Sequence, residues 1–336
     1  TLAMAEITAL GIYFQYWWPN LQSWIPGLIT LLVLLGINLI SARVFGNLEF
    51  SFAIIKIVTI IAFVILVFYL LITNSSTKYG HVSWNNMMID GSIFAKGPKG
   101  FLLGFQMVIF SFIGVELIGL TAAEAKEPKK TITRAIDQLP VRIILFYVLA
   151  ILSILLAIPW KKVSTSSSPF VQALGATGIK NAGSIINFVV ISAAISSTNS
   201  FIYSAGRLLF SINYNGKNKI SKHLGKLDHR QLPKNALVFS TVLIALAPLL
   251  NLFLKDAFTF ISATATSMFL LIWSIMIVTH MTYRKKTPKN ELPTFRMPLY
   301  PISDIAVLIF FIAIIIVLLV FPNYRIPMIS AGIIFT

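Results

Sequence analysis

Long apolar stretches alternate with short polar connections along almost the whole chain. A helix needs about 20 mainly apolar residues to cross the hydrocarbon core of a bilayer. The pattern therefore predicts eight complete membrane spans and two that the ends of the sequence cut short. These segments cover residues 1–18, 26–43, 50–72, 100–122, 140–159, 183–206, 235–254, 257–281, 302–321 and 325–336. The short connections at 19–24 and 43–49 predict antiparallel neighbours.

The composition agrees with this pattern. Of the 336 residues, 57% are hydrophobic and only 11% are charged, with a mean hydropathy of +0.84. A soluble domain of this size does not need so much apolar surface, whereas a bundle of lipid-facing helices does. We predict an all-α integral membrane protein with one domain over residues 1–336. Because the chain begins and ends inside apolar stretches, we expect it to be an internal fragment of a longer protein.

The net charge of +16 could indicate nucleic acid, but the basic residues collect in alternate connections. One set of connections holds 18 of the 27 Lys and Arg residues, the other holds 8, and Lys56 lies within a span. Cytoplasmic loops carry such an excess. The richer side is therefore predicted to be cytoplasmic, and nucleic acid is not an expected partner.

Several classes of chemistry have no support in the sequence. It contains no cysteine, and its four histidines lack metal-ligand spacing. It also contains no GxxxxGK[ST] nucleotide loop and no nucleophile–base constellation. We therefore predict no cofactor, no metal site, no nucleotide and no enzymatic activity.

One predicted span carries a carboxylate and two glycines. Glu116 lies inside the segment 100–122, between Gly114 and Gly119, with Ser111 nearby. A charge at bilayer depth is costly and usually marks a solute or proton pathway. We interpret this stretch as a bent or unwound helix that offers backbone groups to a solute, with Glu116 as proton carrier or gate. The alternative is a straight helix with packing glycines, in which Glu116 bonds to a neighbouring helix.

Two further charges lie in apolar surroundings. Lys56 is expected at a depth of roughly 9–10 Å from the cytoplasmic end of its span. A buried lysine loses its proton readily, so it could replace a bound cation; the alternative is a side chain that reaches back to the interface. Glu6, in the first segment, could pair with Lys56 or Glu116.

Two polar runs leave their alternatives open. In the segment 183–206, helical spacing places Ser197 on one face with Ala193, Ser196 and Ser200. This face could pack closely against another helix, or its hydroxyls could line a coupling-ion or proton site. The charged run 124–130 could form a cytoplasmic gate or a solvated surface.

The run from Phe112 to Ile136, FIGVELIGLTAAEAKEPKKTITRAI, resembles the signature of bacterial amino acid permeases in the amino acid–polyamine–organocation superfamily. Further matches are 49–56, Ser197–Ser200 with Arg207, Thr279–His280 and Arg284–Lys285. The resemblance covers essentially the whole chain. Within the family, residues 106–142 and 168–171 are most similar to the D-serine/D-alanine/glycine permease branch.

This resemblance implies a leucine-transporter-like fold of two inverted five-helix repeats and two extra helices, of which this sequence would cover about helices 3 to 12. In the family, an aromatic residue at the position of Phe110 closes over the substrate, and Ser111 and Gly114 lie in unwound backbone. Lys56 matches a lysine that stands where sodium-coupled relatives bind a cation, which implies proton coupling. The first helix, which holds the substrate carboxylate, would lie outside this sequence.

The sequence thus predicts a multi-pass protein of a bacterial cytoplasmic membrane that imports small neutral amino acids by proton symport and alternating access. Alanine, glycine and serine are the expected substrates, in L- or D-form. An exchanger of the same fold and a non-transporting sensor or remnant are the alternatives. The predicted substrate-binding residues are Phe110, Ser111 and Gly114, and the predicted coupling residues are Lys56, Glu116, Glu6 and Ser197.

Overall fold

The computed structural model describes residues 1–40, 42–88, 94, 96–121, 127–254, 256–288, 290–293 and 297–335. The chain forms two compact units. One comprises residues 2–95 and 137–257, and the other comprises residue 1 with residues 96–136 and 258–336. We name them the lysine unit and the broken-helix unit, after Lys56 and the interrupted span 97–119. The predicted single domain and inverted repeat stay predictions.

Most of the described residues are helical, as predicted for a membrane protein. They include six helical segments long and apolar enough to cross a bilayer: Phe50–Ile72, Gly97–Gly119, Lys130–Ala157, Ala182–Asn213, Ala257–Lys286 and Ile302–Val320. Two of the predicted complete spans instead form shorter helices of 17 residues each, α2 (Trp24–Ile40) and α11 (Lys234–Leu250). The long connection after α3 (Ala42–Ile72) contains a hairpin of β1 (Ser76–Thr77) and β2 (Gly80–His81), followed by the 3-10 turn η1 (Trp84–Met87).

The prediction of a connection at residues 43–49 was wrong, because α3 begins at Ala42 and runs for 31 residues. The prediction used hydropathy, which indicates whether a segment lies in lipid and not whether it is helical. Residues 43–49 contain no proline, so nothing in this stretch ends the helix. Lys56 therefore lies several turns inside a continuous helix, although the apolar stretch itself begins at Phe50.

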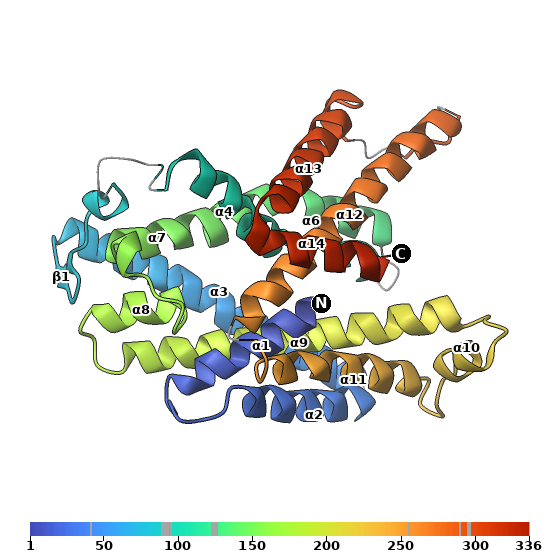
Figure 1. Cartoon of the computed structure of the whole chain (residues 1–336), viewed down its shortest axis with the longest axis horizontal. Helices are drawn as coiled ribbons and strands as arrows, with labels where there is room; N and C mark the ends of the chain where they lie inside the picture. The colour runs from blue at the N-terminus through green and yellow to red at the C-terminus, as the bar shows by residue number, and fades with distance from the viewer. Residues whose placement is uncertain are drawn as a thin grey trace. The chain divides into compact units, whose positions relative to one another are not determined.

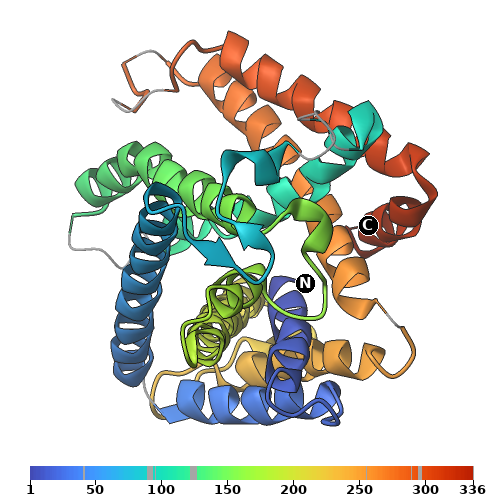
Figure 2. The ribbon, with the colours of Figure 1, turned by 90° about the vertical axis from the view of Figure 1, so that its left-hand side faces the viewer.

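In the lysine unit, α9 (Ala182–Asn213) packs against α1 (Leu2–Gln15), α3, α8 (Pro169–Ala176) and α11 (Figure 1). Figure 2 shows α2 alongside α11, with which it also packs. The contact between α9 and α11 is close at Gly206, where an added Cβ would clash with Cδ2 of Leu237. Small residues allow such close approach of helices in lipid.

A second apolar core of the lysine unit joins α3, α7 (Leu149–Ala157) and α8. Its fully buried members include Phe63, Val67 and Leu156. The Phe63 ring meets that of Phe170 edge-on at 5.2 Å between centroids, a favoured aromatic geometry. Two short helices, η5 (Trp160–Lys162) and α10 (Lys219–Leu224), complete this unit.

The broken-helix unit contains α4 (Gly97–Phe112), α5 (Leu117–Thr121), α12 (Ala257–Lys286), α13 (Ile302–Val320) and α14 (Pro322–Phe335). The boundary between the units falls within α6 (Pro128–Ile143), which continues through the π-helical turn η4 (Ile144–Val148) into α7. Buried Gln106 on α4 donates from Nε2 to Oγ1 of Thr266 on α12, 3.2 Å away. Thr266 in turn donates to the Gln106 carbonyl at 3.1 Å, so this pair joins the two helices.

Candidate functional site

The predicted break in the span 97–119 is confirmed. The helix α4 ends at Phe112 and α5 begins at Leu117, so the backbone leaves the α-helix inside an apolar segment long enough to cross a bilayer. Ile113 is extended, with ψ at 134°, and Gly114 follows with φ at +108°. Only glycine adopts such a positive φ readily. The glycine, rather than the polarity of the segment, makes the break possible.

Glu116 closes the break locally. Both of its carboxylate oxygens lie 3.1 Å from the backbone nitrogen of Gly114, whose N–H donates to them. An amide left without a partner in a buried site costs about 1–3 kcal/mol. Glu116 therefore satisfies a donor that the break has freed, a role that the sequence analysis did not foresee. Its predicted role as proton carrier or gate stays a prediction.

The prediction that Ser111 lies in unwound backbone was wrong. Ser111 belongs to the last turn of α4, and its hydroxyl donates to the Val108 carbonyl at 2.6 Å. A serine hydroxyl can make this bond without leaving the helix. The half-buried ring of Phe110, one residue earlier, meets Phe258 of α12 edge-on at 6.3 Å. Phe258 was not foreseen, since 148 residues separate it from Phe110 along the chain.

Three of the four predicted coupling residues gather in the lysine unit. Glu6 from α1, Lys56 from α3 and Ser197 from α9 line one cavity of about 380 Å³. Glu6 and Lys56, which carry opposite charges, thus share this cavity. The sequence analysis offered Lys56 and Glu116 as alternative partners for Glu6, and Lys56 is the one that lines the same cavity. We call this space the lysine cavity.

Lys56 hydrogen-bonds to Ser196, the residue before the predicted Ser197. Lys56 Nζ donates to Oγ of Ser196 at 3.0 Å, and Ser196 is fully buried. Ser197 lines the lysine cavity, but its hydroxyl donates to the Ala193 carbonyl of its own helix at 3.0 Å. Helical spacing had placed both serines on one face, and it could not say which of them meets α3. Tyr13 and Thr59 also line the cavity and were not predicted.

Buried amides hold the helices around the lysine cavity. Asn38 of α2 donates from Nδ2 to Oδ1 of Asn199 on α9 at 2.7 Å. Asn187 of α9 donates to the Tyr13 carbonyl of α1 at 2.9 Å. Interhelical hydrogen bonds of this kind stabilise helix association in lipid by about 0.6–2 kcal/mol each. They join α2 and α1 to α9, the helix that carries Ser196.

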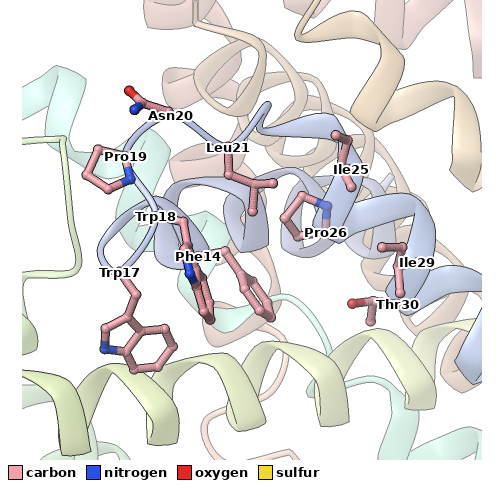
Figure 3. Close-up of a pocket in the computed structure, with 10 residues that line it drawn as sticks. All are labelled: Phe14, Trp17, Trp18, Pro19, Asn20, Leu21, Ile25, Pro26, Ile29 and Thr30. Carbon is pink, nitrogen blue, oxygen red and sulfur yellow. The ribbon is translucent and has the colours of Figure 1, made fainter.

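A larger cavity of about 700 Å³ lies where α1 turns into α2 (Figure 3). Phe14 and Trp18 stack along its wall with their ring centroids 6.3 Å apart. The described lining residues carry no charge. Tryptophan is enriched where helices meet the membrane surface, so this cavity has the chemistry of a membrane interface rather than of a site for a zwitterion.

The remaining predictions concern metals and the charged run 124–130. Among the described residues, no cluster of three acidic or histidine side chains could hold a metal ion. Glu124 and Lys126 lie outside the described residues. Lys130 pairs with Glu127 at 3.5 Å, and both side chains are largely exposed, which favours solvated surface charge for this part of the run.

Comparison with known proteins identifies the family. The family model described as "Amino acid permease" matches residues 1–334. The chain belongs to the amino acid permease family. It is an amino acid transporter of the multi-pass membrane class and not an enzyme.

Three bacterial relatives illustrate the similarity. The "Uncharacterized transporter YdgF" of Bacillus subtilis is 40% identical over 98% of this chain and 72% of its own length. The "Amino-acid permease AapA" of the same organism is 41% identical over 98% of this chain and 71% of its own. The "D-serine/D-alanine/glycine transporter" of Escherichia coli K12 is 36% identical over 94% of this chain and 68% of its own.

Proposed function

We propose that this permease imports small neutral amino acids together with protons. The observation that carries the proposal is the Lys56 ammonium, hydrogen-bonded to Ser196 at the lysine cavity with Glu6 beside it. An ammonium held there supplies the positive charge that a bound cation would otherwise bring. A buried lysine releases its proton readily. Loss and gain of that proton, with Glu6 as neighbouring carboxylate, would link substrate movement to the proton gradient.

Ser197 belongs to the same proposal through its position. It lines the cavity one residue after the hydroxyl that binds Lys56. Its hydroxyl is a second polar group on the wall of the cavity, past which a proton reaching or leaving the ammonium would move.

The broken span supports the substrate class. Unwound backbone in a membrane offers N–H and C=O groups to the carboxylate and amino groups of an amino acid. Gly114 supplies this freedom, Ser111 adds a hydroxyl, and Phe110 would cover the bound solute. The one carboxylate of the break, Glu116, already accepts from Gly114. A substrate with an uncharged side chain therefore fits better than a basic one.

The size of the substrate is proposed from relatives. Besides the "D-serine/D-alanine/glycine transporter", the "DL-alanine permease SerP2" of Lactococcus lactis is 36% identical over 84% of this chain. Their printed names favour alanine, glycine and serine, in either configuration. The similarity to the D-serine/D-alanine/glycine branch leads us to include the D-forms.

The coupling can be tested in liposomes that contain the purified permease. With an alkaline interior, labelled alanine is expected to accumulate above its outside concentration, and the accumulation should vanish when an ionophore collapses the gradient. Lys56→Gln should lower gradient-driven uptake at least about tenfold, which corresponds to about 1.4 kcal/mol. Lys222→Gln, a change at an exposed residue far along the chain, should leave uptake unchanged.

Three outcomes would contradict the proposal. Uptake at the same rate with and without a proton gradient would contradict proton coupling. Uptake that depends on sodium would contradict the proposal that Lys56 replaces a bound cation. Uptake only into vesicles preloaded with amino acid would identify an exchanger. Competition with unlabelled D-serine, glycine, leucine and arginine then tests the substrate class, since only the first two should compete well.

A further inference from the structure

The broken-helix unit contains a cavity that the transport proposal does not use. It has a volume of about 700 Å³ and lies at the end of α12, beside α6 and the start of α13. Most of its wall is apolar, with Ile136, Ile277, Leu292 and Met297 among the lining residues. We call it the α12 cavity. Its volume is in the range of small-molecule sites.

A positively charged side chain, that of Arg284, lies against this apolar wall. Arg284 lines the cavity, and its guanidinium carbon lies 4.1 Å from the ring centroid of Tyr300, a favourable cation–π distance. Its Nε is buried and has no hydrogen-bond partner among the described residues. Lys285 and Lys286 follow on the same helix and are exposed. A guanidinium held by a ring keeps donors available for another acceptor.

The acidic residue of the cavity, Asp304, pairs with a histidine. Asp304 is fully buried in the first turn of α13, and its Oδ2 lies 2.7 Å from Nδ1 of His280. The histidine N–H donates to the carboxylate. The positive end of the α13 helix also favours a negative charge in its first turn. The other carboxylate oxygen, Oδ1, is buried with no hydrogen-bond partner among the described residues. The cavity therefore combines an apolar interior, a buried acid that pairs with His280 through one oxygen, and a basic rim.

We propose that the α12 cavity binds an anionic phospholipid, with an acyl chain against the apolar wall and the phosphate on Arg284 and the adjacent lysines. The charge count places the end of α12 on the cytoplasmic side. Basic pockets between helices on that side suit anionic headgroups, and a planar guanidinium binds phosphate oxygens in pairs. A zwitterionic lipid offers the same chain but no net charge. The proposal is independent of the transported solute.

The direct test compares two lipids with identical acyl chains on the purified protein. Native mass spectrometry, after titration with palmitoyl-oleoyl phosphatidylglycerol or phosphatidylcholine, should show at least about fivefold tighter retention of phosphatidylglycerol. Arg284→Gln should bring the two lipids close to equal, and Arg284→Lys should restore part of the preference. Lys222→Gln, which removes an exposed charge on the same predicted side, should change nothing.

A second pair of variants tests the cavity rather than the charge. Ile277→Trp should fill the apolar space and lower retention of phosphatidylglycerol several-fold. Ile275→Trp adds the same ring to an exposed position of α12 outside the lining and should not. Unfolding temperatures of all variants show whether each protein is folded before its lipid binding is compared.

Several results would overturn the proposal. Equal retention of the two lipids by the unchanged protein is one, and a preference that survives Arg284→Gln is another. Glycerol 1-phosphate that competes as well as the whole lipid would mean a site for free phosphate compounds. A dimer that buries the cavity without added lipid would assign it to a second copy of the chain.

Discussion

The helix α9 and the interrupted pair α4–α5 respond differently to polar residues in lipid. The helix α9 carries five consecutive polar residues, Ser196 to Ser200, and still runs unbroken for 32 residues. The span 97–119 has fewer polar residues, yet it leaves the helix between Phe112 and Leu117. Polar content alone therefore does not decide where a membrane helix opens.

The hydrogen bonds explain the difference. On α9 the hydroxyls of Ser192, Ser197 and Ser200 donate to carbonyls three or four residues earlier, so the backbone stays helical. In the broken span, Gly114 takes a positive φ and Glu116 accepts its freed N–H. A break needs a residue that can turn and an acceptor for the amide. Hydroxyls that bond to their own helix provide neither.

The largest expected effect comes from removing the turn. Gly114→Ala places a Cβ on a backbone with φ at +108°, which costs about 1–3 kcal/mol if the conformation is kept. Gradient-driven uptake of alanine should fall at least about tenfold. Gly104→Ala on the same helix is the control, since no atom lies within 4 Å of its added Cβ. Equal uptake by both variants would mean that the break is not needed for transport.

The next effect concerns the packing that supports α9. Gly206→Ala should destabilise the protein by about 1–3 kcal/mol, because its Cβ would meet Leu237. Unfolding in detergent, followed by circular dichroism, gives the midpoint. At Gly36 of α2 nothing lies within 4 Å, so Gly36→Ala should be neutral or slightly stabilising. Equal unfolding midpoints for Gly206→Ala and Gly36→Ala would mean that the close contact between α9 and α11 does not stabilise the protein.

A smaller effect separates the two adjacent serines of α9. Ser196→Ala removes an acceptor of the Lys56 ammonium and should cost about 1–2 kcal/mol. Ser197→Ala removes only a bond to its own helix and should cost about half as much or less. Denaturant titrations of the purified variants measure both values. The reverse order would mean that Ser197 is the partner of Lys56.

The smallest effect is expected for Glu116→Gln. Glu116→Gln keeps an oxygen that can accept from Gly114, so stability should change by about 0.5 kcal/mol or less. Glu116→Ala leaves the amide without that acceptor and should cost about 1–3 kcal/mol. Comparing the pH profiles of uptake adds a second readout. A profile unchanged in Glu116→Gln would assign Glu116 to the backbone, and a shifted profile would support proton transfer.

Much of the fold and part of the site could be predicted from the sequence. All ten predicted segments contain helices, because apolar length is a property of each segment by itself. The break was also predictable, since Gly114 and Glu116 lie within two residues of each other. The helical state of residues 43–49 was missed because polar residues can extend a helix beyond the lipid. The helical position of Ser111 was missed because composition does not locate the last helical turn.

The sequence by itself determined that this chain is a helical membrane protein with a lysine inside one span and an opening in another. Those properties depend on hydrophobic length, buried charge and the freedom of one glycine. Only the tertiary structure decided that Lys56 meets Ser196, that Asn38 meets Asn199, and that Asp304 meets His280. Such pairs depend on how each helix is rotated and how far it is shifted against its neighbour, and periodicity along a single helix contains neither quantity.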